Sequence, residues 1–549
     1  MNLRISLVII AFCSSSLSFS APLMGHKMMV ATPSPLSAQV AEQIMKKKGN
    51  VVDVAVAIAL VLAVTNPRHA SLGGGGFAMV KMGKDSVQAL DFREKAPEKF
   101  HKNFFKDKDK SATRKGPHGV GVPGIPAGLW ALHKKYGKLH WSVLFDEPIK
   151  LAKKGHFITG ENSQRLKNVY KDFNPAGKKY FLNKKGEVPK AGELVIQKQL
   201  AKALKLMRNR NIVPFYEGQI GRDIVSTLQN AGGVMTREDL KSYKVRWLKP
   251  LEKDYQGHKI YLMPPPSSGG LIISSSLSML EKLKTYENPP LSTNEFHHFA
   301  EILKINFRNR NLLGDPDYVK NPVSEFTDPT KISNWVAKIN SDKILKLDPI
   351  SNKEFKESNQ TTHFTVMDIN GNAVSMTITL NNVFGSKIVS NKYGIALNNE
   401  MDDFTTHPGE ANSFLLTQGM NNLPEGGKRP LSSMSPTLIE KNGKVVGALG
   451  APGGPRIISG VLMTLYRLIS QGFNMEEAIH APRVHHQFKP NTLFVDKNRL
   501  PPLSIKALEK LGHKVKPSWH SIVNGVYLNK QGLLEAGYDN RAEGAAGGF

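Results

Sequence analysis

The chain has almost no cysteine, since Cys13 is the only one among its 549 residues. One cysteine cannot form a disulfide within the chain, so the stability of the fold must come from its packed core. Cys13 lies in a segment near the N-terminus that we predict is removed, which leaves the mature chain without cysteine. Thiol catalysis and cysteine-based metal sites are therefore excluded.

Apolar runs long enough to cross a bilayer are also absent from the sequence. Near the N-terminus, Arg4 precedes a mostly apolar run over residues 5–12, and small residues follow up to Ser20 and Ala21. A charged start, a short apolar stretch and small residues at the cleavage point are typical of a signal peptide. A short membrane anchor is the alternative, but a transmembrane helix needs about 20 apolar residues. We predict a signal peptide over residues 1–20, cleaved near Ser20, and a periplasmic or secreted protein with no membrane anchor.

Acidic residues are few, because 46 Asp and Glu stand against 74 Lys and Arg and give a net charge of +28. Such an excess of basic residues attracts anionic partners over long distances. The sequence has, however, no zinc-finger spacing, RNP-like aromatic motif or basic helix with heptads. We interpret the charge as a solvated basic surface that steers anionic substrates, and we predict no nucleic-acid partner. A nucleic-acid or membrane-surface role is the alternative.

Metal-binding patterns are equally scarce. The histidines that could suggest a metal site are His363, His485 and His486. None belongs to an HExxH motif or has a carboxylate at ligand spacing. We assign no metal and expect no dissociable cofactor.

The composition, with 40% hydrophobic and 22% charged residues, is that of a globular protein. Its apolar periodicity predicts helices at residues 37–48, 51–64, 193–207, 221–229, 271–284, 456–471 and 475–481. It predicts strands at residues 77–80, 250–263, 361–368, 373–380, 387–397 and 435–449. Strands interleaved with two helical blocks indicate a layered α/β architecture. The polar composition of residues 340–360 predicts an exposed linker.

One strand pair places a threonine at a chemically useful position. Residues 361–368 alternate in polarity, Asn370-Gly371 follows as a turn, and residues 373–380 are apolar and β-branched, which predicts a hairpin. If the bond before Thr361 is cleaved, its hydroxyl becomes a nucleophile and its freed α-amine the base. An α-amine has a pKa of about 8, so part of it is free base at neutral pH. Without that cleavage, Thr361 is an ordinary strand threonine.

Four motifs indicate a family. They are Asn359-Gln360-Thr361-Thr362-His363, Asn398-Asn399-Glu400-Met401-Asp402-Asp403-Phe404, Arg429-Pro430-Leu431-Ser432-Ser433-Met434-Ser435-Pro436 and Pro452-Gly453-Gly454. Their residues and order resemble those of the γ-glutamyltransferase (γ-glutamyltranspeptidase) family, and the likeness covers nearly the whole chain after the leader. The resemblance implies a four-layer αββα sandwich of the N-terminal-nucleophile hydrolase type, which matures by self-cleavage. Cleavage between Gln360 and Thr361 would give a large subunit, residues 21–360, and a small catalytic subunit, residues 361–549, held together as a heterodimer.

The same resemblance implies an exported γ-glutamyltransferase and glutathione hydrolase. Thr361 would form a γ-glutamyl ester from glutathione or another γ-glutamyl donor and pass it to water, amino acids or dipeptides. Thr379 lies across the predicted hairpin and would position Thr361. The backbone N–H groups of Gly453 and Gly454 would hold the oxyanion, while Pro455 has no N–H to add.

A γ-glutamyl donor carries an α-carboxylate and an α-ammonium, and the resemblance assigns residues to each. Arg93 would bind the carboxylate, because a guanidinium offers parallel N–H donors, and Ser432 and Ser433 would add hydroxyl donors. The residues assigned to the amino end are Asn381, Glu400 and Asp403. Many bacterial relatives carry glutamine at the position of Glu400, so the contact with the ammonium there differs between members.

Simpler interpretations are available for the same residues. Arg93 could form a surface ion pair with Asp91 or Glu94, and the acidic pair that begins at Glu400 could be a hydrated turn. Pro-Gly-Gly is also a common turn, and a Ser-Ser pair after proline is ordinary turn chemistry. The loop over residues 404–428 resembles a lid with Phe414 as its aromatic residue, although it could equally be a surface loop.

Two other functions stay open at this point. The first is a related acylase that cleaves a glutaryl-type side chain, such as that of a cephalosporin. Its donor has no α-ammonium and thus no use for Glu400 and Asp403, so these acids favour the γ-glutamyl donor. The second is a non-catalytic exported binding protein that keeps the fold without maturing, against which the intact Thr361 and the accessible linker argue.

Overall fold

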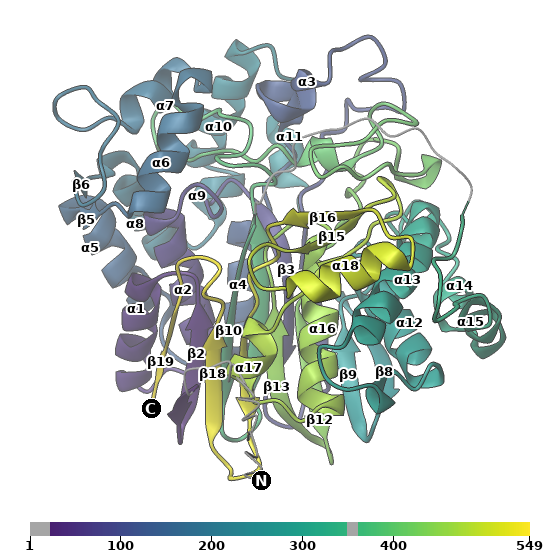
Figure 1. Cartoon of the computed structure of the whole chain (residues 1–549). Coiled ribbons are helices and arrows are strands. Elements are labelled where there is room, and N and C mark those ends of the chain that lie inside the picture. The colour runs from purple at the N-terminus through teal and green to yellow at the C-terminus, as the bar shows by residue number, and fades with distance from the viewer. Residues whose placement is uncertain (1–21, 348–360) are drawn as a thin grey trace, which may run out of the picture.

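The computed structural model describes residues 22–347 and 361–549, and Figure 1 shows its central strands with helices on either side. The predicted signal peptide and Gln360, on one side of the predicted cleavage site, lie outside these residues. Within the described ranges, every helix is too short or too polar to cross a membrane.

One seven-stranded sheet contains the predicted hairpin, and each pair of neighbouring strands in it is antiparallel. Its strands, in spatial order, are β19 (Ala545–Gly548), β2 (Met28–Thr32), β10 (Thr362–Asp368), β11 (Ala373–Thr379), β3 (Gly75–Lys81), β4 (Gln88–Phe92) and β7 (Arg246–Leu248). Thr362 pairs with Ile378 and Met367 with Ala373, so the hairpin predicted from the Asn-Gly turn is confirmed.

The second seven-stranded sheet is also antiparallel throughout. Its strands, in spatial order, are β1 (Leu23–Gly25), β18 (Leu534–Tyr538), β17 (Asn524–Leu528), β13 (Lys444–Gly450), β12 (Thr437–Lys441), β9 (His258–Leu262) and β8 (Leu251–Tyr255). The facing sides of the two sheets share one buried apolar cluster, to which Met29 and Phe77 belong from the first sheet and Leu438 and Ala448 from the second.

Helices cover the outer face of each sheet (Figure 1). The first sheet is covered by α1 (Pro35–Lys46), α2 (Val51–Thr65) and α4 (Ile125–Tyr136), and α5 (Asp146–Lys154) and α8 (Lys198–Arg210) complete the layer beside α2. The second is covered by α12 (Gly269–Lys282) and α16 (Arg456–Ser470), and α13 (Thr293–Asn309) packs against α12. Helix α2 is buried along its whole length because nearly all its residues are apolar, and its one acid, Asp53, closes a capping box with Asn50. The predicted αββα sandwich is confirmed.

The remaining elements are short and lie around this sandwich. The other helices are α3 (Ser111–Arg114), α6 (Gly160–Val169), α7 (Pro175–Tyr180), α9 (Val213–Tyr216), α10 (Gln219–Asn230), α11 (Arg237–Lys241), α14 (Ser324–Thr327), α15 (Pro329–Val336), α17 (Met475–His480) and α18 (Pro502–Lys510). The other strands are β5 (His156–Phe157), β6 (Leu194–Val195), β14 (Val484–His485), β15 (Leu493–Asp496) and β16 (Val515–Ser518).

Two predicted elements differ from those in the structure. The strand expected at residues 387–397 is wrong, because the segment is a loop whose only sheet-like contacts among the described residues are two isolated bridges, Val389 with Ala396 and Leu397 with Gly73. The helix expected from residue 193 begins at Lys198, because strand β6 takes the preceding residues and pairs with β5.

Candidate active site

The predicted site residues converge on one pocket of about 320 Å³. Those that line it are Arg93, Thr361, Thr379, Asn381, Glu400, Asp403, Ser432, Ser433 and Gly454. Gly453 precedes the last of these in the chain. The other lining residues are Arg310, Phe414, Leu416, Met434, Pro455 and Ile457. Residues from both sides of the predicted cleavage site thus build a single cavity.

Thr361 lies immediately before β10 and is 7% exposed. Its Oγ1 is 3.3 Å from Oγ1 of Thr379, the last residue of β11. The backbone N–H of Asn381 donates to Thr379 Oγ1 at 2.9 Å. Thr379 Oγ1 accepts this hydrogen bond through one of its lone pairs, and its hydroxyl proton can be donated to Thr361 Oγ1.

Gly453 and Gly454 form the turn between β13 and α16, with φ angles of 130° and 56°. Both angles lie in the region that favours glycine. A Cβ at Gly454 would also lie 2.6 Å from the Phe414 ring. Neither N–H group donates a hydrogen bond to any residue that the structure describes, and Gly454 lines the pocket.

Arg93 is buried beneath the pocket and is not the surface residue that its alternative interpretation required. It is 1% exposed, its Nη1 donates to Glu400, and its Nη2 donates to Asp403 at 2.6 Å. These carboxylates raise the pKa of the guanidinium despite its burial. Asp91 does not pair with the Arg93 side chain, because its carboxylate faces Arg246 and Arg429.

Glu94 adds a third carboxylate to this cluster. It is fully buried, and neither of its oxygens has a hydrogen-bond partner among the described residues. The nearest cation is Arg93, with Nη1 3.8 Å from Oε2. Burial outweighs that attraction and raises the pKa of Glu94 to about 7. Burial also raises the pKa of Glu400 and of Asp403, so both acids resist ionisation even with the Arg93 guanidinium beside them.

Arg310 is a lining residue that sequence reasoning missed. It follows α13 directly and is 2% exposed. Its Nε donates to Ser268 Oγ at 3.0 Å and its Nη1 to Gln418 Oε1 at 2.9 Å. Burial lowers its pKa to about 10, which still leaves it charged at neutral pH. In a chain with 74 basic residues, a single arginine at a helix end carries no signal of its own.

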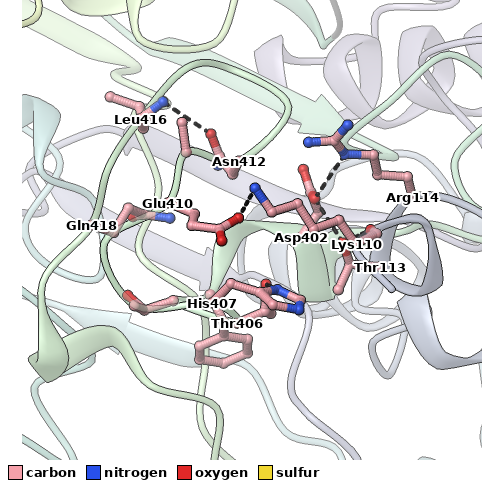
Figure 2. A pocket seen from close by; sticks show the side chains of 13 residues that line it. Lys110, Thr113, Arg114, Asp402, Thr406, His407, Glu410, Asn412, Leu416 and Gln418 are labelled. Atoms are coloured by element: carbon pink, nitrogen blue, oxygen red, sulfur yellow. Dashed lines mark hydrogen bonds and ion pairs between the residues drawn. The ribbon is translucent and has the colours of Figure 1, made fainter. Parts of the chain in front are cut away.

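The loop after Asp403 forms one wall of the pocket, since Phe414 and Leu416 line it. The same loop encloses a neighbouring polar pocket of about 310 Å³, whose side chains Figure 2 shows. There Lys110 forms an ion pair with Glu410, and Thr113 donates to Asp402 Oδ1 at 2.8 Å. The ion pair ties the loop to the segment that carries α3, and the Thr113 hydrogen bond ties the same segment to the residues just before the loop.

The histidines considered as metal ligands have other partners. His363 bonds to Thr365 and Thr377, His485 to Ser459 and Gln487, and His486 to Asn491. Within the described ranges, one buried group has metal-ligand spacing, namely His297, Glu301 and His513. Its acid is already engaged by Lys304 Nζ at 2.6 Å and by the Leu345 N–H at 2.7 Å. None of these residues lines the active-site pocket.

Known proteins match this chain along most of its length. The family described as Gamma-glutamyltranspeptidase matches residues 37–549. The chain belongs to this family. It is 38% identical over 502 residues to the glutathione hydrolase proenzyme of Pseudomonas sp. (strain A14), covering 90% of this chain and 87% of that protein. The glutathione hydrolase proenzyme of Escherichia coli (strain K12) is also 38% identical, over 503 residues, with the same coverage.

Solved structures agree with the family. The crystal structure of Helicobacter pylori γ-glutamyltranspeptidase is 34% identical with a TM-score of 0.55, and covers 60% of this chain and 93% of that one. The cephalosporin acylase from Bacillus halodurans has a TM-score of 0.86 and covers 99% of both chains. At 23% identity this second likeness concerns the fold alone. The predicted N-terminal-nucleophile hydrolase fold and the predicted enzyme class are confirmed.

Proposed function

We propose that this member of the family is an exported γ-glutamyltransferase and glutathione hydrolase that cleaves itself between Gln360 and Thr361. The observation that carries the proposal is the position of Thr361, whose hydroxyl reaches the pocket beside Thr379. Its φ angle of 131° is one that a β-branched residue rarely adopts, and cleavage of the preceding bond would relieve it. Relatives named as proenzymes support maturation by cleavage.

The chemistry is acyl transfer through the new N-terminus. The freed α-amine of Thr361 takes the proton from Oγ1, which attacks the γ-carbonyl carbon of the donor. The N–H groups of Gly453 and Gly454 stabilise the oxyanion that forms. Collapse breaks the amide bond, and the leaving amine takes the proton from the α-ammonium. Water or an acceptor amine then attacks the γ-glutamyl ester and restores the Thr361 hydroxyl.

The donor is held by its charged end. Arg93, Ser432 and Ser433 bind its α-carboxylate. The groups that hold its α-ammonium are Asn381, Glu400 and Asp403. Since the two acids are buried and have raised pKa values, an ammonium is the partner that stabilises their ionised forms. A glutaryl donor lacks that ammonium, which favours a γ-glutamyl donor such as glutathione.

The mature enzyme would be a heterodimer of residues 21–360 and 361–549, after removal of a signal peptide over residues 1–20. The sheet arrangement supports lasting association of the two chains. Strands β2, β3, β4 and β7 come from the first segment and share a sheet with β10, β11 and β19 from the second.

The test is a comparison of donors with the purified, processed protein. Glutathione and a glutaryl amide of the same leaving group are assayed side by side, with and without a dipeptide acceptor. We expect kcat/KM to favour the γ-glutamyl donor by at least about 100-fold, because the glutaryl donor brings no ammonium to acids that outnumber the single guanidinium beside them. A higher kcat/KM for the glutaryl donor would establish the acylase alternative, and binding without turnover would establish the binding protein.

A further inference from the structure

Two hydrogen-bond donors in the active-site pocket have no acceptor. Ser433 Oγ is buried and unpaired, on a residue that is 7% exposed. Arg310 is 2% exposed, and its Nη2 forms no hydrogen bond or ion pair with the residues that the structure describes. Both residues line the same cavity. A buried donor is nearly always paired, so the unpaired Ser433 Oγ points to an acceptor supplied by the ligand, and Arg310 Nη2 offers a second donor on the same cavity.

The charge around Arg93 argues for a second cation in the pocket. Both terminal nitrogens of Arg93 donate to carboxylates, those of Glu400 and Asp403. Glu94 lies 3.8 Å away as well. A donor carboxylate placed beside this cluster would meet one guanidinium and up to three negative charges. In a buried pocket such like-charge repulsion is strong, so Arg93 alone is a poor carboxylate site.

Arg310 differs from Arg93, because its hydrogen-bond partners are neutral and Asp403 is the acid whose charge acts on it. Ser268 and Gln418 accept its hydrogen bonds without cancelling its charge. Both partners also fix its position relative to the recognition loops. Ser268 Oγ donates to the carbonyl of Ser432 at 2.8 Å, and Gln418 Nε2 donates to the carbonyl of Asp403 at 2.6 Å. The guanidinium is therefore preorganised between the serine loop and the acidic loop, with one terminal nitrogen left over.

We infer that Arg310 is a further donor-binding residue, whose guanidinium shares with Arg93 and Ser433 the binding of the donor α-carboxylate. The inference rests on the proposed γ-glutamyl function and adds a residue to it. In this arrangement Arg93 mainly positions the two acids, Glu400 and Asp403, that bind the α-ammonium. Arg310 supplies the positive charge that the carboxylate requires, so it determines specificity for donors with an anionic group at that end.

Three p-nitroanilide donors separate this role from a general effect on the pocket. The γ-glutamyl compound carries both charged groups, the glutaryl compound only the carboxylate, and the 4-aminobutyryl compound only the ammonium. For Arg310→Gln we expect KM to rise about 10- to 100-fold for the two donors with a carboxylate, which is the loss of one charged hydrogen bond. The 4-aminobutyryl donor should keep its KM within about threefold. A donor that turns over slowly is compared instead by its inhibition constant against the γ-glutamyl compound.

Controls keep the outcomes distinct. Arg308→Gln removes an exposed arginine that lies over Trp335, and should change none of the three KM values. Arg310→Lys keeps the charge and serves as the second variant if Arg310→Gln fails to fold. Its KM should rise for the two carboxylate donors, by less than that of Arg310→Gln, and should stay unchanged for the 4-aminobutyryl donor. Equal KM changes for all three donors, or none, would overturn the role of Arg310. A wild-type protein without γ-glutamyl turnover would instead contradict the proposed function itself.

Discussion

At the scale of single residues, the hydroxyl of Thr379 links the nucleophile to the backbone of the next loop. It lies 3.3 Å from Thr361 Oγ1 and accepts the N–H of Asn381. For Thr379→Val we expect kcat to fall about 10- to 100-fold with little change in KM, because the orientation of Thr361 is lost but no donor contact is. The matched control is Thr377→Val, on the same strand, whose hydroxyl bonds to His363 instead. An equal loss of kcat in both variants would contradict a specific role for Thr379.

Glu94 makes the stability of the fold depend on pH. Burial raises its pKa from 4.5 to about 7, so the folded state holds a proton that the unfolded chain releases between these values. The stabilisation is complete below pH 4.5 and is lost as the pH rises through 7. For Glu94→Gln, the free energy of unfolding relative to wild type should therefore increase by roughly 2–3 kcal/mol from pH 4.5 to pH 8. Denaturant unfolding at the two pH values measures this, and a difference that does not change with pH would refute the shift.

At the scale of elements, the turn before α16 joins oxyanion binding to the wall of the pocket. Gly454 has a φ of 56°, and an added Cβ would lie 2.6 Å from the Phe414 ring. Gly454→Ala should lower kcat at least about 10-fold, because the turn or the ring must move. Gly472→Ala is the control, since Gly472 also has a positive φ, 69°, but open space around it. It should cost about 1 kcal/mol of stability and leave kcat unchanged; comparable kcat values for the two variants would contradict this account of the turn.

Local patterns predicted the elements where burial and periodicity agree. Helix α2 and the β10–β11 hairpin follow directly from an apolar run and an Asn-Gly turn. The prediction of a strand at residues 387–397 was wrong because polar contacts with the rest of the molecule, such as that of Asn174 with Val389, replace sheet pairing there. Such contacts join residues far apart in the sequence and leave no periodic signal.

The candidate site was likewise predicted from the sequence only in part. Residues within recognisable motifs, such as Arg93 and Glu400, could be assigned from resemblance, and the structure brings them together in one pocket. Their mutual pairing was not predicted, because the sequence places them 307 residues apart. Arg310 and Glu94 were not assigned a role, since the position of Arg310 on the pocket and the unpaired state of the buried Glu94 carboxyl are visible only in three dimensions.

At the scale of the whole molecule, the two predicted subunits are interleaved. Within the first sheet, β2 pairs with β19 on one side and β10 on the other, and β3 pairs with β11. Each of these contacts joins strands from opposite sides of the predicted cleavage site. The processed protein should therefore elute as one species of both chains in size-exclusion chromatography, and separate only in denaturant. Dissociation in native buffer would contradict the shared core.

The central claim is that Thr361 becomes an N-terminal nucleophile by self-cleavage, and the most direct test is the denatured mass spectrum of wild type beside that of Thr361→Ala. We expect two chains from wild type, the smaller beginning at Thr361, and one uncut chain from the variant. The variant should also lose γ-glutamyl turnover by at least about a thousandfold. Normal processing of Thr361→Ala, or an active wild-type protein that remains a single chain, would contradict the account.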